Sequence, residues 1–143
     1  MWIEREIAGE LRAAAASFPV VVLVGPRQVG KTALVERTFP RHHYCSLDVA
    51  SHAEMAETRP TDFLARHPPP VVLDEVQYAP AFFRHIKTAV DARRDRRGLF
   101  VLTGSQNFLL MESVADSLAG RAAVIPLLGL SGAEWAATQA GEP

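Results

Sequence analysis

The sequence is poor in cysteine and in long hydrophobic runs, and it has almost no net charge. Cys45 is the single cysteine among 143 residues, so an intramolecular disulfide is impossible, which favours a cytoplasmic location. The longest apolar runs, such as residues 18–24, are too short to cross a bilayer, and we find no secretory signal. We therefore expect a cytoplasmic protein without a membrane partner.

The charge balance also disfavours one class of partner. A formal net charge of −1 gives no broad basic field that would attract nucleic acid, so any such contact would have to come from a local patch. The arginines between residues 93 and 97 are interleaved with Asp91 and Asp95, which is more typical of a solvated helix end. With 48% hydrophobic and 22% charged residues, the composition is that of an ordinary globular domain, and we expect residues 1–143 to form a single one.

Short apolar runs alternate with amphipathic stretches along the chain. Helical spacing of Ile3, Ile7 and Leu11 predicts an N-terminal helix over residues 1–17. Strands are predicted at 20–24, 43–47, 71–73, 99–103 and 122–126, and helices at 31–38, 50–56, 61–66, 80–97 and 108–119. Gly98 is expected to cap the helix that ends at residue 97. This alternation predicts an α/β fold with a parallel sheet covered on both faces, followed by a short tail over residues 130–143.

A glycine-rich motif follows the first predicted strand. The residues from Gly25 to Thr32 match the pattern G-x-x-x-x-G-K-[ST], and a predicted helix begins directly after it. Glycines let successive backbone N–H groups turn toward an anion, and the helix directs its positive end to the same place. We expect the phosphates of a nucleotide to bind to the following residues: Gly25, Pro26, Arg27, Gln28, Val29, Gly30, Lys31, Thr32 and Ala33.

Two residues of this motif have specific predicted roles. The ammonium of Lys31 would reach the β- and γ-phosphates, and the hydroxyl of Thr32 would coordinate Mg²⁺. The alternative is a glycine-containing turn that matches by chance. The buried strand before the motif and the helix after it favour the binding site, with ATP and Mg²⁺ as its ligands.

Two acids follow the third predicted strand. Asp74 and Glu75 come directly after the apolar residues 71–73, so they would project at the carboxyl edge of a parallel sheet. Downstream of a phosphate loop, the first acid is expected to hold Mg²⁺ and the second to polarise the attacking water. The alternative for Glu75 is a solvated loop acid.

Two further residues are candidates for contact with the γ-phosphate. Ser105 follows the fourth predicted strand and would either report the nucleotide state or cap the next helix. Arg121 precedes the fifth predicted strand, and its guanidinium would either neutralise charge on the transferred phosphoryl group or interact with a helix end.

Taken together, these motifs resemble those of AAA-type P-loop ATPases. More narrowly, the chain is similar to a prokaryotic AAA-domain family whose members usually carry a C-terminal domain of unknown function. The resemblance covers about residues 1–135 and depends on the segments GPRQVGKT (25–32), CSLDV (45–49), VVLDEVQ (71–77), IKTAVD (86–91), LTGSQNF (102–108) and SLAGR (117–121).

The resemblance implies a three-layer P-loop NTPase sandwich whose five-stranded parallel sheet has the order 5-1-4-3-2. It assigns Lys31 and Thr32 to the Walker A motif, Asp74 and Glu75 to Walker B, and Ser105 to the vicinity of sensor 1. Arg121 would occupy the arginine-finger position, acting in cis or from a neighbouring subunit. Family members normally continue into a further domain, so this chain is expected to be truncated before one.

The leading hypothesis is therefore Mg²⁺-dependent binding and hydrolysis of ATP. A second hypothesis is an ATP-dependent interaction switch with little turnover, in which residues 103–121 would contact a partner protein or a second copy of the chain. A third is an ATPase stimulated by nucleic acid, because the residues from Asp74 to Gln77 resemble a helicase box. The absence of an Asn-Lys-x-Asp motif argues against GTP as the nucleotide.

Overall fold

The computed structural model describes residues 2–26, 30–105 and 107–127, without the side chains of residues 2–5 and Phe108. Five parallel strands form one sheet in the order β2-β3-β4-β1-β5, which confirms the predicted strand order and topology. The strands are β1 (Val20–Val24), β2 (His43–Ser46), β3 (Val71–Asp74), β4 (Phe100–Gly104) and β5 (Ala122–Pro126).

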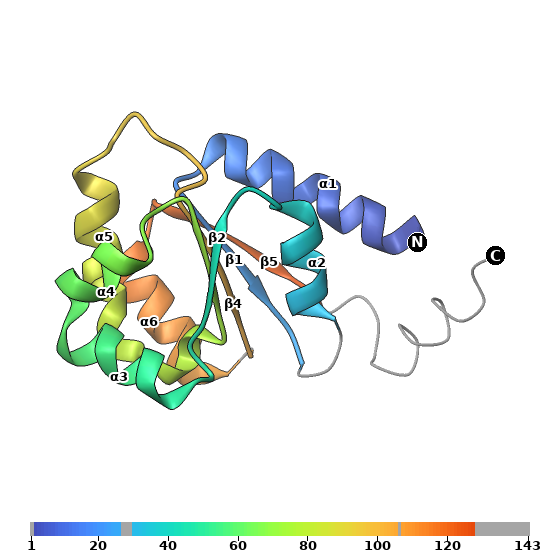
Figure 1. Ribbon diagram of the computed structural model, residues 1–143. Coiled ribbons are helices and arrows are strands. Elements are labelled where there is room, and N and C mark those ends of the chain that lie inside the picture. The colour runs from blue at the N-terminus through green and yellow to red at the C-terminus, as the bar shows by residue number, and fades with distance from the viewer. Residues whose placement is uncertain (1, 27–29, 106, 128–143) are drawn as a thin grey trace.

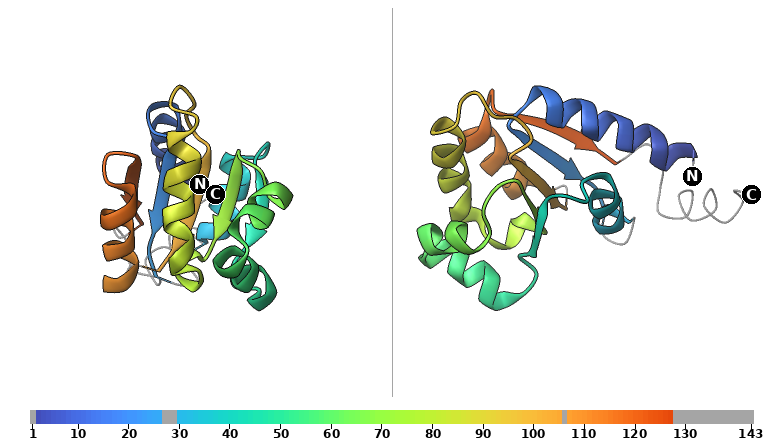
Figure 2. Two further views of the ribbon diagram at one scale, coloured as in Figure 1. Left: turned by 90° about the vertical axis from the view of Figure 1, so that its left-hand side faces the viewer. Right: turned by 45° about the horizontal axis from the view of Figure 1, so that its top comes forward.

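Helices cover both faces of this sheet, as Figures 1 and 2 show. Helices α1 (Trp2–Ser17) and α2 (Lys31–Thr38) pack on one face. The other face is covered by α3 (Ala50–Thr58), α4 (Pro60–Arg66), two short 3₁₀ helices η1 (Val76–Tyr78) and η2 (Pro80–Phe82), α5 (Phe83–Asp91) and α6 (Phe108–Leu118). Among the described residues, we find no helix long and apolar enough to span a membrane.

The two hydrophobic clusters explain why the sequence forms these layers. Strand β1 consists of five fully buried β-branched or leucine side chains, which alternate between the faces. Val21 and Leu23 pack with α1 and α2, while Val20, Val22 and Val24 pack with the helices on the other face. A strand that is apolar on both faces is stable only in the centre of a covered parallel sheet.

One predicted helix ends earlier than the sequence indicated. We expected it to continue to Arg97, but α5 ends at Asp91 and a turn follows. Phe83, Ile86 and Val90 bury the helix face against the sheet, whereas the next positions on that face are arginines that would lose hydration there. Gly98 is therefore not the cap of this helix; its backbone N–H donates to the Phe18 carbonyl at 2.9 Å.

Because all five strands run in the same direction, the sheet has a carboxyl edge and an amino edge. The arrowheads in Figure 1 point toward the bottom of the view, and the loop between α5 and β4 lies at the top. Ligands of open parallel sheets bind outside the carboxyl ends of the strands. This edge is where most of the predicted site residues lie.

Candidate nucleotide site

The loop between β1 and α2 begins the site. Gly30 immediately precedes α2 with φ 86°, a left-handed conformation that a glycine adopts without the strain of a side chain. The first turn of α2 begins at Lys31, and no side chain caps it, so its N–H groups remain oriented toward the loop. Three predicted phosphate ligands, Arg27, Gln28 and Val29, lie outside the described residues.

Lys31 is 4% exposed, and its ammonium lies against the backbone of the same loop. Its Nζ donates to the carbonyl of Gly25 at 2.9 Å and to that of Pro26 at 2.7 Å. A buried ammonium requires such partners because it has lost its hydration. The positive charge is thus held beside the loop in which phosphates are expected to bind.

Asp74 is the last residue of β3 and accepts hydrogen bonds from three hydroxyl groups. Thr32 Oγ1 donates to its Oδ2 at 2.7 Å, Tyr44 Oη donates to the same oxygen at 2.6 Å, and Thr103 Oγ1 donates to Oδ1. The carboxylate is only 3% exposed, so these donors replace the water that it would otherwise bind. Its three partners come from α2, β2 and β4.

The strand register explains the last of these contacts. Leu73 of β3 pairs with Leu102 of β4, so the next residues, Asp74 and Thr103, lie level with each other. For Tyr44, burial and the adjacent Asp74 carboxylate raise the pKa well above its usual range. The Tyr44 hydroxyl therefore stays protonated and remains a hydrogen-bond donor at neutral pH.

Glu75 follows Asp74 in a left-handed conformation with φ 60°, the only positive φ among the described non-glycine residues. Its N–H donates to Thr103 Oγ1 at 3.0 Å, and its Oε2 accepts from Gln77 Nε2 at 2.6 Å. A cavity of about 380 Å³ is lined by Gly30, Lys31, Thr32, Ala33, Glu36 and Glu75. Because of the turn after β3, Glu75 lines the same cavity as the first residues of α2.

The donor set fits a magnesium ion that is held mainly by nucleotide phosphates. The Thr32 hydroxyl and the Asp74 carboxylate, the two predicted ligands, are already adjacent. No group of three or more His, Cys, Asp or Glu side chains that could hold a metal occurs among the described residues. Mg²⁺ in nucleotide sites is typically held by one or two carboxylates together with water and phosphate oxygens.

Ser105 lies at the same edge, directly after β4. Its backbone N–H donates to Gln77 Oε1 at 3.4 Å, and its carbonyl accepts from Asn107 N at 3.0 Å. Asn107, not Ser105, is the N-cap of α6, because its side chain accepts from Leu110 N at 2.7 Å. Ser105 therefore does not cap α6, which was one of its two predicted roles.

Arg121 lies at the opposite edge of the sheet. It precedes β5, whose first residue Ala122 pairs with Val20 at the amino end of β1. A parallel strand rises about 3.3 Å per residue, so Arg121 is roughly 15 Å from the carboxyl edge. Its Nε and Nη2 donate to the Asp91 carboxylate at 2.8 Å and 3.0 Å. This pairing lowers the pKa of Asp91 and raises that of Arg121.

The structure thus brings Lys31, Thr32, Asp74, Glu75 and Ser105 to one edge and leaves Arg121 at the other. It also adds three residues that the sequence analysis did not assign: Tyr44, Thr103 and Gln77. Thr103 was detectable as a polar residue ending an otherwise apolar strand, and Gln77 as a polar residue two positions after Glu75. Nothing local marks Tyr44, because its contact depends on the position of β2 beside β3.

Comparison with known structures indicates the same architecture. A crystal structure described as a DNA replication initiation factor superposes on 87% of this chain and 44% of its own, with a TM-score of 0.53 and 16% sequence identity. A structure of C. elegans PCH-2 covers 87% of this chain and 41% of its own, with a TM-score of 0.48 and 17% identity. At such low identity, the likeness to the replication factor shows the fold alone.

Comparison of sequences identifies the family. Uncharacterized proteins of Mycobacterium bovis and Mycobacterium tuberculosis are each 33% identical over 133 residues, which is 92% of this chain and 30% of theirs. The chain therefore spans less than a third of the length of these relatives. A family model described as an AAA domain matches residues 17–136. The chain thus belongs to the AAA domain family, and its fold is that of a nucleotide-binding ATPase-type domain.

Proposed function

We propose that this domain binds Mg²⁺-ATP at the carboxyl edge of its sheet and hydrolyses it. The observation that carries the proposal is the convergence of Lys31, Thr32 and Glu75 on one cavity, with Asp74 hydrogen-bonded to Thr32 behind it. An ammonium, a hydroxyl–carboxylate pair and a second carboxylate are the groups that phosphoryl transfer to water requires. We also propose a cytoplasmic location, which the single cysteine in the sequence favours.

Each residue has a distinct chemical task in this proposal. The Lys31 ammonium, released from the loop carbonyls, would bind oxygens of the β- and γ-phosphates and offset their negative charge. Thr32 and Asp74 would hold Mg²⁺, which when bound neutralises charge on the same phosphates. Ser105, at the end of the neighbouring strand, would contact the γ-phosphate or the attacking water.

Glu75 would orient that water. As the water oxygen bonds to the γ-phosphorus, the bond from phosphorus to the leaving ADP oxygen breaks, and the Glu75 carboxylate accepts the proton of the water. The strained turn at φ 60° and the hydrogen bond to Thr103 fix the backbone from which this carboxylate extends. Such orientation of the reactants is a major source of rate enhancement in enzymes.

Arg121 could take part only from another copy of the chain. Within its own chain it lies at the amino edge, too far from the cavity for a side chain to bridge. We therefore propose a homo-oligomer in which the amino edge of one subunit faces the carboxyl edge of the next. The guanidinium would then stabilise charge on the phosphoryl group of the neighbour.

The test is phosphate release from Mg²⁺-ATP over a range of protein concentrations. The chain contains only two lysines, which provides a matched pair of variants. We expect Lys31→Ala to abolish release and Lys87→Ala, at an exposed position on α5, to leave it unchanged. Activity that persists in Lys31→Ala, or is absent from the parent chain at every concentration, would contradict hydrolysis at this site.

A second candidate function is an ATP-dependent interaction switch. The observation that favours it is an apolar groove beside the site, where Leu109 is 73% exposed on α6 and Tyr78 is 41% exposed. The affinity of a partner protein for this groove would depend on whether ATP is bound. Association that requires ATP but is unaffected by Glu75→Gln would support this function, whereas association that is independent of ATP would contradict it.

A further inference from the structure

The side-chain amide of Gln77 joins the ends of two neighbouring strands. Its Nε2 donates to Glu75 Oε2 at 2.6 Å, and its Oε1 accepts from the backbone N–H of Ser105 at 3.4 Å. A carboxylate can only accept and a backbone N–H can only donate, so a single orientation of the amide satisfies both partners. Gln77 therefore connects the end of β3 to the end of β4.

The sequence of β4 makes room for this amide. Gly104 is the last residue of the strand, and a Cβ atom there would lie 3.0 Å from Gln77 Oε1 and 2.6 Å from Leu110 Cδ2. Neither distance is tolerated by a real side chain without displacing its neighbour. A side chain at this position would therefore displace Leu110 or Gln77.

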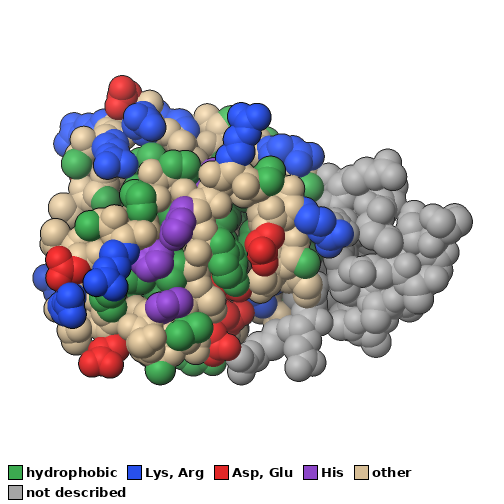
Figure 3. All heavy atoms as spheres, viewed as in Figure 1, with side chains coloured by type: hydrophobic (Ala, Val, Ile, Leu, Met, Phe, Trp, Pro, Cys, Tyr) green, Lys and Arg blue, Asp and Glu red, His purple; other side chains and the backbone are tan. Residues whose placement is uncertain are grey.

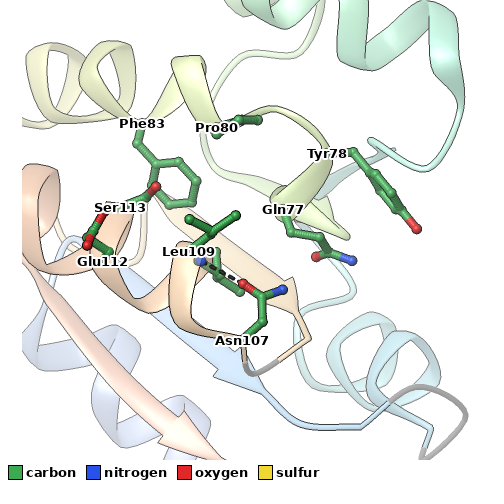
Figure 4. A pocket seen from close by; sticks show the side chains of 9 residues that line it. Gln77, Tyr78, Pro80, Phe83, Asn107, Leu109, Glu112 and Ser113 are labelled. Carbon is green, nitrogen blue, oxygen red and sulfur yellow. Dashed lines mark hydrogen bonds between the residues drawn. The ribbon is translucent and has the colours of Figure 1, made fainter.

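Gln77 and Glu75 line different cavities. Glu75 lines the cavity of about 380 Å³ at the start of α2, which Gln77 does not line. Gln77 instead lines the apolar groove of about 600 Å³ between η2, α5 and α6, where Figure 4 shows it with Pro80, Phe83 and Leu109. It can therefore contact Glu75 without occupying the space predicted for the phosphates.

We propose that Gln77 is a positioning residue that holds the Glu75 carboxylate in its working orientation. The inference rests on the proposed function, because Glu75 is taken there as the group that orients water. A carboxylate rotates readily about its terminal torsion, which is broad and has no strong preference. A donor fixed to Oε2 removes this freedom and leaves the other oxygen to accept from the water.

The predicted consequence is a separation of turnover from binding. Without the Gln77 donor, Glu75 would still be present but would sample orientations that do not face the water. We expect kcat to fall at least about tenfold, since small losses of alignment are costly in the reacting geometry. The affinity for Mg²⁺-ATP should change less than about twofold, because Gln77 does not line the phosphate cavity.

Three variants test this prediction. Gln77→Glu keeps the shape and an acceptor for Ser105 but removes the donor to Glu75, so its kcat should fall with unchanged ATP affinity. Gln77→Leu removes both hydrogen bonds and should lower kcat at least as much. Thr88→Ala, at an exposed position on α5 away from Glu75, should keep the parent kcat. Parent-like kcat in Gln77→Glu, or equal losses of kcat and affinity, would overturn the proposal.

A second measurement tests the contact without any turnover. In ¹⁵N-labelled protein, the side-chain amide signal of Gln77 is identified by its loss in Gln77→Leu. Glu75→Ala should shift that signal, because it removes the acceptor of Nε2, and an unshifted signal would disprove the contact. If the parent chain releases no phosphate while the signal does shift, the proposed hydrolysis has failed and the Gln77–Glu75 contact has not.

Discussion

The two edges of the sheet differ in how their polar groups are satisfied. At the carboxyl edge, hydroxyl, carboxylate, amide and ammonium groups from α2, β2, β3 and η1 bond to one another or to the backbone. Both Lys31 and Asp74 are buried. At the amino edge, charged groups are mostly exposed. Figure 3 shows Lys and Arg side chains over the loop between α5 and β4, where Arg93, Arg94, Arg96 and Arg97 are all exposed.

This difference in hydrogen bonding and burial is the physical basis for the site that we propose at the carboxyl edge. Buried polar groups that are already mutually hydrogen-bonded need little rearrangement when a ligand replaces some of their partners. Exposed arginines are screened by solvent and salt, so they contribute little until another surface desolvates them. We therefore predict that the carboxyl edge binds a nucleotide without a second subunit, whereas the amino edge acquires a role only against a second molecule.

The largest expected effect tests whether the two edges work together. Arg121→Ala should lower turnover at least about 10³-fold, as removal of an arginine finger does, while ATP affinity is retained. Asp91→Asn is the matched control, because it breaks the same ion pair but keeps the guanidinium. It should have parent-like turnover.

Mixing two inactive variants sharpens this test. Arg121→Ala has an intact carboxyl edge, and Lys31→Ala has an intact amino edge. If Arg121 acts in trans, phosphate release by the mixture will exceed the sum of the separate variants. A mixture that remains at that sum would show that the two edges do not meet between subunits.

A smaller effect is expected from the hydroxyls around Asp74. Tyr44→Phe removes one of three donors from a carboxylate that is 3% exposed, which should lower the free energy of unfolding by about 1 kcal/mol. Tyr78→Phe, on an exposed tyrosine away from Asp74, is the matched control. Urea unfolding measures both, and equal stabilities would show that Tyr44 does not support the carboxyl edge.

The smallest effect concerns His67, which follows α4 and lies beside two other histidines. Burial and the nearby His43, His52 and Arg66 lower the pKa of His67 from 6.5. The unfolded chain therefore binds this proton more tightly, so the free energy of unfolding should fall as the pH drops through about 6.5. The histidine side chains that gather on the face in Figure 3 illustrate this crowding.

Substitutions distinguish the contribution of His67 to the pH dependence of stability from that of the other histidines. His67→Asn should reduce the dependence of stability on pH below 6.5, and His85→Asn, at an exposed position on α5, should not. Thermal unfolding between pH 5 and pH 8 provides the comparison. An unchanged slope in His67→Asn would mean that other groups cause the dependence.

Sequence reasoning was most successful where a pattern is local. The alternation of short apolar runs with amphipathic stretches predicted a parallel sheet covered on both faces, and the family resemblance implied its strand order. Both are confirmed. Thr32, in the glycine-rich motif, donates to the Asp74 carboxylate, while the roles assigned to both residues remain predictions. The contact between Thr32 and Asp74 depends on the turn that precedes α2 and on the position at which β3 ends.

The contacts that were missed and the helix boundary that was wrong both depend on tertiary structure, which no local sequence pattern contains. The contacts of Tyr44 and Gln77 depend on which strands are neighbours and on the absence of a side chain at Gly104. The helix predicted to reach Arg97 failed because propensity alone does not show where a helix face stops meeting the sheet. Arg121 was placed next to β5 correctly, but only the sheet shows that this is the far edge.

The chain contains two tyrosines, and their positions give it a built-in pair of spectroscopic probes. The Tyr44 hydroxyl bonds to the carboxylate expected to hold Mg²⁺, while Tyr78 lines the apolar groove. Fluorine-labelled tyrosine would therefore yield two ¹⁹F resonances, one for each place. Titration with Mg²⁺-ATP should move the first, and any movement of the second would report communication between nucleotide and groove without an attached dye.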